Sequence, residues 1–320
     1  MRMIRSTLLG GPEDPRWARP VLWVLAALAA LLHFLGMGAD PHPYYLIGTA
    51  CAGASVFALY AAVGTRFGHG AGVLAGLALA LSPVGIGRTS ASDALALLLL
   101  ILAAHAVAAR GPILVRAACA LVLGGAGVAV MEAEPWGFDT DLHGANLLAG
   151  AGSLADVPGG PFVWLLPFAA VSFAAGLAIA RRDRARVAVL LLWGDWTAVS
   201  YLGYALGHSN GEAFTVLVPP GIAALAGIGA ALMGRTGRPW PAVLSGCVLG
   251  TASVAFLVLG TEPDFQPWLR WTVAALACAS AALMAGQRLA CGSATLSGLL
   301  AGLAGPAVLA LAAAGIIATG

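Results

Sequence analysis

Long apolar runs follow one another along the whole chain, separated by shorter polar stretches. A helix needs about 20 apolar residues to cross a hydrocarbon core of about 30 Å. The pattern therefore predicts an all-α, polytopic transmembrane helix bundle with about eleven spans. The expected spans are 21–38, 44–64, 70–88, 93–109, 112–131, 162–180, 187–206, 214–233, 242–260, 269–286 and 296–318.

The composition supports a chain whose surroundings are mostly lipid. Hydrophobic residues make up 60% of the 320 residues and charged residues only 9%, whereas a soluble domain carries roughly a quarter charged residues. The formal net charge of +2 is too small to indicate a nucleic-acid partner. The five cysteines lie in or beside apolar runs and form no C-x-x-C pair, so we expect packing residues rather than disulfides or metal ligands.

The placement of arginine predicts the orientation. The 16 basic residues are all arginine, and 14 of these 16 fall in alternate connections. The positive-inside rule makes that side cytoplasmic and places the N-terminus there. The first span follows a basic stretch, as in a signal peptide, but no convincing cleavage site comes after it, so we expect a retained helix.

One connection, 132–161, is much longer than the others and contains neither Lys nor Arg. Such length favours a functional or disordered segment, and the predicted topology puts it outside the cell. We therefore expect a cytoplasmic tail over 1–20, a module of five helices over 21–131, the external loop, and a module of six helices over 162–320.

Polar side chains gather on the predicted outer side. Carboxylates and histidines at a membrane surface can bind a divalent cation or act as general bases. The alternative is that short connections carry polar residues simply to face water, and an acid in a first helical turn also complements the helix dipole. The candidates are Asp40, His42 and Tyr45 after the first span, Arg88 and Asp93 at the start of the fourth, Glu132 and Glu134 in the long loop, and His208 after the seventh.

One acid and two histidines inside the expected spans need an explanation. Asp195 falls in LLLWGDWTAVSYLGY, within the seventh span. An acid near the middle of a membrane costs roughly 2.5–3.5 kcal/mol, and such residues commonly mark function. The alternative is a structural acid bonded to Trp193, Trp196 or Tyr201. We expect His33 and His105, also within spans, to be neutral and bonded to backbone carbonyls.

Three stretches together resemble a known family. Residues 52–100 contain FG, then AGVLAGLALALSPV, then an Asp that opens a Leu-rich helix; residues 159–182 read GGPFVWLLPFAAVSFAAGLAIARR; and residues 189–230 contain LLWGDW and then GHSNGEAFTVLVPPGIAALAGIGA. In order and spacing they resemble membrane glycosyltransferases of the GT-C superfamily, in particular the protein-mannosyltransferase-like and aminoarabinose-transferase-like enzymes of actinobacteria.

The resemblance implies an enzyme of a bacterial plasma membrane that takes a sugar from a polyprenyl-phosphate carrier at the outer face. A carboxylate activates the acceptor hydroxyl, and basic groups or a divalent metal steady the leaving phosphate. Asp93 matches the family's Asp at the head of the Leu-rich helix, and Asp40 lies where the first external loop begins. Arg88 is the expected phosphate contact. The remaining substrate-binding residues are expected to be His42, Tyr45, Glu132, Glu134 and His208.

The chain also departs from the family pattern, which leaves two alternatives. The first external loop shrinks to about Gly38–Pro43, and no lysine follows the fifth span, where Glu132 and Glu134 stand instead. A non-catalytic GT-C-like protein, which binds a polyprenyl lipid or assists a partner membrane enzyme, would fit this loss. A transporter or flippase is the second alternative, and Asp195 is its main support.

Overall fold

The structure, a computed structural model, consists of helices throughout the part of the chain that it describes. The described residues are 15, 17–36, 43–82, 91–109, 111–132, 165–206, 211–236, 240–260 and 267–289. They form ten α-helices: α2 (Ala18–Gly36), α3 (Pro43–Phe67), α4 (His69–Ala80), α5 (Ala91–Ala108), α6 (Ile113–Glu132), α7 (Leu166–Ala180), α8 (Arg184–Leu206), α9 (Gly211–Arg235), α10 (Trp240–Gly260) and α11 (Pro267–Leu289).

Each of the first ten expected spans overlaps one of these helices, in the expected order. The helix in the third expected span is shorter than expected: α4 ends at Ala80, and the residues after it are described only as far as Ser82. The last expected span, 296–318, and the loop 133–161 lie outside the described residues. The all-helical architecture is thus confirmed, whereas the count of eleven spans and the division into modules stay predictions.

Several of the helices have the length and the apolar surface of membrane spans. Among the described residues, four segments are long and apolar enough to cross a bilayer: Leu46–Phe67, Ala91–Ala108, Ile113–Val130 and Val216–Arg235. Large apolar side chains also cover the outside of the bundle, as on α6, where Leu114 is 80% and Leu121 76% exposed. Water would not favour such a surface, whereas lipid tails match it. The described helices are therefore consistent with a helical membrane protein.

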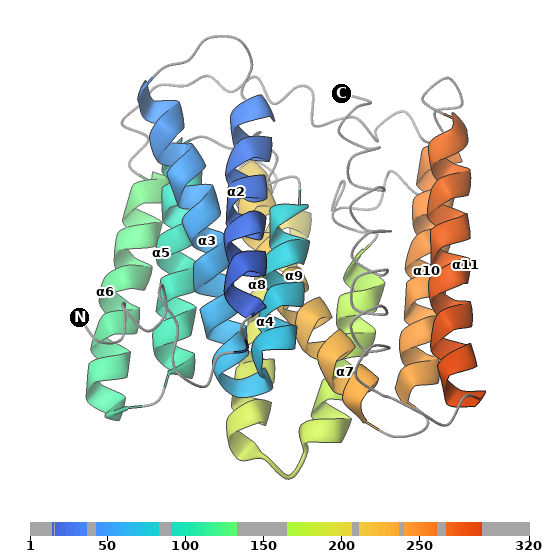
Figure 1. Cartoon of the computed structure of the whole chain (residues 1–320). Coiled ribbons are helices and arrows are strands. Elements are labelled where there is room, and N and C mark those ends of the chain that lie inside the picture. Colours follow the sequence, from blue (N-terminus) through green and yellow to red (C-terminus); the bar gives the residue numbers. More distant parts are fainter. Residues whose placement is uncertain are drawn as a thin grey trace.

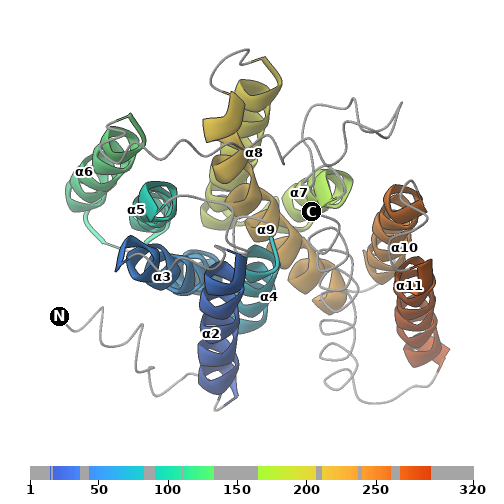
Figure 2. The same ribbon diagram turned by 90° about the horizontal axis from the view of Figure 1, so that it is seen from above.

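Helix α9 lies at the centre of the bundle and contacts α4, α7 and α8 (Figures 1 and 2). Its glycines permit this packing. A Cβ atom at Gly227 would lie 2.5 Å from the backbone nitrogen of Ala75 in α4, and one at Gly229 would lie 2.8 Å from Cα of Ser172 in α7. No real side chain fits there, so only glycine lets these helices approach so closely.

Two prolines, Pro219 and Pro220, interrupt the hydrogen-bond ladder inside α9. Proline has no N–H to donate to the preceding turn, and its ring disturbs that turn. The indole Nε1 of Trp196 in α8 donates to the carbonyl oxygen of Leu217 in that turn, over 2.7 Å. A side chain of a neighbouring helix thus adds a hydrogen bond to the backbone in the turn that the prolines disturb.

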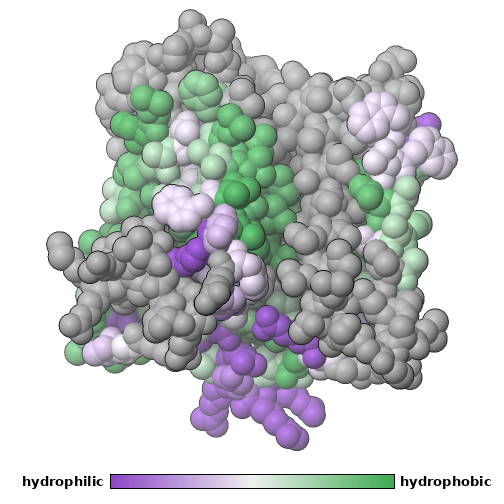
Figure 3. All heavy atoms as spheres, in the orientation of Figure 1, coloured by the Kyte–Doolittle hydropathy of each residue, from purple (hydrophilic) through white to green (hydrophobic). Residues whose placement is uncertain are grey.

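One end of the bundle is basic. The turn between α7 and α8 exposes Arg181 and Arg182, and hydrophilic side chains gather at this lower edge in Figure 3. At the neighbouring helix ends, Arg66 donates from Nε and from a terminal nitrogen to the carbonyl oxygen of Ala108, each over 3.2 Å. Cationic side chains at helix C-termini satisfy unpaired carbonyls and complement the helix dipole.

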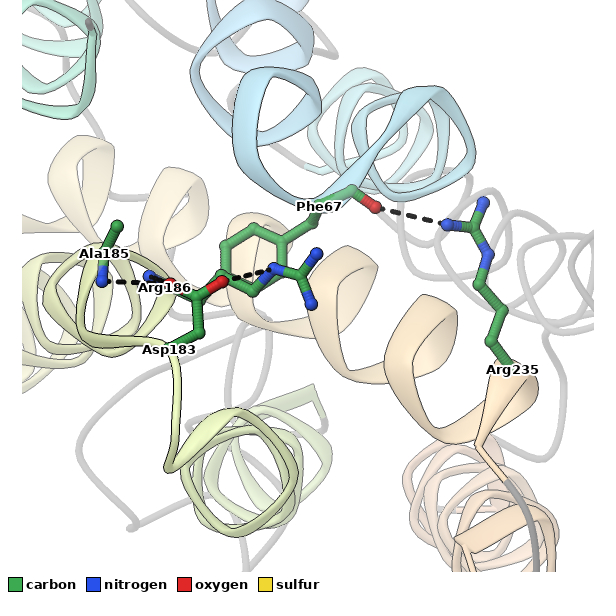
Figure 4. A network of polar contacts seen from close by, with 5 residues as sticks. All are labelled: Phe67, Asp183, Ala185, Arg186 and Arg235. Carbon is green, nitrogen blue, oxygen red and sulfur yellow. Dashed lines mark hydrogen bonds and ion pairs between the residues drawn. The ribbon is translucent and has the colours of Figure 1, made fainter.

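Two further contacts organise the same end (Figure 4). Arg235, at the end of α9, donates to the carbonyl oxygen of Phe67 at the end of α3, over 3.4 Å. Asp183 caps α8 by accepting from the backbone N–H groups of Ala185 and Arg186, each over 3.1 Å. Two of the arginines from which the orientation was predicted, Arg66 and Arg235, therefore also donate hydrogen bonds to carbonyl oxygens at the ends of α5 and α3.

Candidate functional site

The structure describes only some of the predicted site residues. Asp93 lies in the first turn of α5. Tyr45 falls in the first turn of α3 and Glu132 is the last residue of α6, so their backbones are placed. Asp195 lies midway along α8. The other candidates lie outside the described residues: Asp40, His42, Arg88, Glu134 and His208.

The C-terminal part of α2 and the N-terminal turns of α3 and α5 meet at the end of the bundle opposite the basic one (Figure 1). Gly48 of α3 marks the point of contact. A Cβ atom there would lie 2.9 Å from Nε2 of His33 in α2 and 3.3 Å from Cα of Ala91 in α5. We call this contact, defined by His33, Gly48 and Ala91, the three-helix junction.

Three polar residues, His33, Thr49 and Asp93, lie at or within two residues of the three-helix junction along their helices. His33 is fully buried, and the hydroxyl oxygen of Thr49 is buried without a hydrogen-bond partner in the described chain. Asp93 follows Ala91 by two residues, so its backbone lies in the turn of α5 that meets α3. The junction thus brings an imidazole, a hydroxyl and a carboxylate to neighbouring turns of three helices at one end of the bundle.

The local sequence explains why the helices begin here. Proline is favoured at the first position of a helix, because its fixed φ suits the helix and its missing N–H is not needed there, and α3 begins at Pro43. An acid in the first turn interacts favourably with the positive end of the helix dipole, as Asp93 does in α5. The interaction of Asp93 with the helix dipole therefore does not exclude a role of its carboxylate as a general base.

His33 was not among the site residues predicted from the sequence. Only its place in the sequence could have pointed to it: His33 lies near the end of the first apolar run, which leads into the polar stretch with Asp40 and His42. What the sequence could not reveal is the glycine of α3 that faces the imidazole. Contact with Gly48 places His33 against α3, which meets α5 at the same residue.

Asp195 does not belong to the three-helix junction. Its side chain is exposed on the outer face of α8, whereas Trp193 and Thr197 on the opposite face are buried. The indole of Trp196 bonds to α9 rather than to Asp195. The structural alternative in which Trp196 satisfies the acid is therefore wrong.

The described residues do not form a metal site of their own, because no three His, Cys, Asp or Glu side chains gather among them. Of the predicted site residues described at this end of the bundle, Asp93 carries a carboxylate, a group that can accept a proton from a hydroxyl. Comparison with family models, with curated proteins and with solved structures gives no match. The resemblance to GT-C glycosyltransferases therefore remains a prediction from the sequence.

The contact at Gly48 can be tested through the native Cys51, which is buried one turn further along α3. In a chain that keeps Cys51 as its single cysteine, we expect Gly48→Ala to speed its alkylation by N-ethylmaleimide several-fold in mild detergent, because the added methyl group forces α3 away from α2 and α5. Gly64→Ala is the matched control, since a Cβ there meets nothing within 4 Å. Equal rates in both variants would contradict the junction.

Proposed function

We propose that this protein is a membrane-embedded glycosyltransferase-like protein that moves a sugar from a polyprenyl-phosphate carrier to an acceptor at the outer face of the membrane. The observation that carries the proposal is the three-helix junction. It puts the turn with Asp93 at one end of an apolar bundle, next to the buried His33. A lipid carrier in the membrane and a polar acceptor outside it meet at such a place.

The charge distribution supports the orientation that this function needs. Exposed arginines mark the end of the bundle at the α7–α8 turn, and by the positive-inside rule that end faces the cytoplasm. The three-helix junction lies at the other end, which then faces outward. We therefore propose a multi-pass protein of a bacterial plasma membrane with eleven spans and a cytoplasmic N-terminus.

In the proposed reaction, a carboxylate of Asp93 or Asp40 accepts the proton of the acceptor hydroxyl. The hydroxyl oxygen forms a bond to the anomeric carbon of the sugar, and the bond from that carbon to the carrier phosphate breaks. The polyprenyl phosphate leaves with the electron pair, and Arg88 neutralises its charge. General-base assistance of this kind contributes about 10²- to 10⁴-fold to the rate.

A non-catalytic protein that binds the same lipid is the second candidate. It is favoured by the short connection between α2, which ends at Gly36, and α3, which begins at Pro43. The family resemblance implies a longer loop with a catalytic acid at this place.

By contrast, Asp195 faces out of the bundle, whereas the acids that carry ions in transporters face its interior, so the structure lends the transporter no support.

The proposal predicts that the purified chain in nanodiscs transfers hexose from a radiolabelled polyprenyl-phosphate hexose. We expect Asp93→Asn or Asp40→Asn to lower the rate about 100-fold or more, because the amide cannot accept the proton. Asp183→Asn is the matched control, since an amide still caps α8 at the basic end and the rate should not change.

The outcomes separate the two candidates. Transfer that is lost in an Asn variant which still binds the labelled lipid identifies an enzyme and its base. Lipid binding without transfer by the wild-type chain, across several sugar donors, would replace the enzyme by the non-catalytic protein. Transfer that survives in both Asn variants would reject the assigned bases.

The orientation has its own test. In otherwise cysteine-free chains in intact cells, we expect Ala91→Cys to react with a membrane-impermeant maleimide added outside, because α5 begins at the outer end. Arg182→Cys, in the exposed α7–α8 turn, should react only after the membrane is opened. The reverse pattern would contradict the cytoplasmic N-terminus.

A further inference from the structure

The turn between α7 and α8 carries the densest positive charge of the described chain. Residues 181–186 read RRDRAR, so four arginines surround a single aspartate, and all six residues are exposed. We call this segment the basic turn. Figure 1 shows it extending beyond the ends of α3 and α5 at the same end of the bundle, and hydrophilic side chains gather along this edge in Figure 3. The charge is therefore presented to the surroundings and not to the rest of the bundle.

Contacts within the protein use only part of this charge. Asp183 forms an ion pair with Arg186 over 3.3 Å. Arg181, Arg182 and Arg184 form no hydrogen bond or ion pair with the described residues. Three positive charges of the basic turn thus have no negative partner in the part of the chain that the structure describes.

The stability of the fold does not explain these charges. At the same end, Arg66, Arg116 and Arg235 donate to backbone carbonyl oxygens of neighbouring helices, so their guanidinium groups have a structural role. In the basic turn, by contrast, Arg184 and Arg186 stand in the first turn of α8, where no acid stands. A cation at a helix N-terminus faces the positive end of the helix dipole, which is unfavourable. A negatively charged partner outside the described helices would offset this.

The ends of three apolar helices show where the surface of a bilayer lies. Three of the four segments that are long and apolar enough to cross a bilayer end on the side of the basic turn, and the hydrogen bonds of Arg66 and Arg235 join these ends to one another. With these segments in a membrane, their common end marks the border of the hydrocarbon core. The basic turn, which extends beyond it, then lies at the level of the lipid headgroups. The three segments are Leu46–Phe67, Ala91–Ala108 and Val216–Arg235.

We propose that the basic turn binds the phosphate groups of anionic phospholipids in the leaflet on its side of the membrane. A guanidinium group matches a phosphate with two parallel N–H donors and stays charged at every physiological pH. Lipids of net negative charge are favoured over zwitterionic ones, because the latter carry their own cation beside the phosphate. An anionic leaflet also attracts each arginine near its surface. Such lipids surround this end of the spans on every side.

This site requires that the spans lie in a membrane, but it does not depend on sugar transfer. It lies at the end of the bundle opposite the three-helix junction. The two proposals can therefore fail separately.

The test measures which lipid gathers at the turn. In a cysteine-free chain in liposomes, Ala185→Cys carries a donor fluorophore, and the acceptor is placed on an acyl chain of either phosphatidylglycerol or phosphatidylcholine. We expect phosphatidylglycerol to be enriched about 5-fold at the turn in low salt, the gain of a single arginine at an anionic surface. The enrichment should disappear at 1 M salt, because exposed charges are then screened within about 3 Å. The donor on Ala91→Cys, at the opposite end, should show no enrichment.

Charge variants leave Asp183 and Arg186, and with them the start of α8, untouched. Replacing Arg181, Arg182 and Arg184 together by Gln should bring the transfer to phosphatidylglycerol down to the value for phosphatidylcholine. Replacing the same three residues by Lys is the matched control. It keeps the charges and should retain most of the enrichment.

Three results would overturn the proposal. Transfer to the two lipids could be equal at the wild-type turn. The enrichment could survive the Gln variant, or appear equally at Ala91→Cys, so that it would not belong to the basic turn. Finally, a photoreactive group on Ala185→Cys in native membranes could attach to a protein and not to lipid, which would assign the basic turn to an acidic protein partner.

Discussion

The close approach of α9 to α4 and α7 is the contact on which the other helices depend. At Gly227 the backbones of α9 and α4 come so near that a single added carbon would touch the nitrogen of Ala75. In a membrane, lipid tails are as apolar as the helices, so the hydrophobic effect does not drive the helices together. Their association depends instead on close packing and on hydrogen bonds between helices. Glycine contacts supply the packing, and the bond from Trp196 to Leu217 supplies a hydrogen bond where the prolines interrupt α9.

This central contact also joins the two halves of the chain. Helix α4 belongs to the first half and packs on α3, which in turn meets α5 and α2. The three-helix junction is therefore positioned through α4 and α3 by the helix at the centre of the bundle. At the opposite end, Arg235 of α9 bonds to the last residue of α3. The arginines that determine orientation in a membrane thus stabilise the helix ends as well.

The sequence was sufficient to predict where the helices lie but not how they pack. The order of apolar runs predicted the order of the ten described helices, because hydropathy is a local property. A span that is apolar on every side carries no pattern to show which face is buried. For that reason the central position of α9, the contact of His33 with Gly48 and the outward direction of Asp195 required the structure. The GT-C resemblance and the catalytic roles of Asp40 and Asp93 stay predictions.

The most direct measurement of the central claim is the thermal stability of Gly227→Ala in detergent, compared with Gly234→Ala in the same helix. A Cβ at Gly227 meets the backbone of α4, whereas one at Gly234 meets nothing within 4 Å. We expect Gly227→Ala to lower the free energy of unfolding by about 1–3 kcal/mol through overpacking, and Gly234→Ala to leave it unchanged or raise it slightly. Equal stability of the two variants would contradict a bundle built around α9.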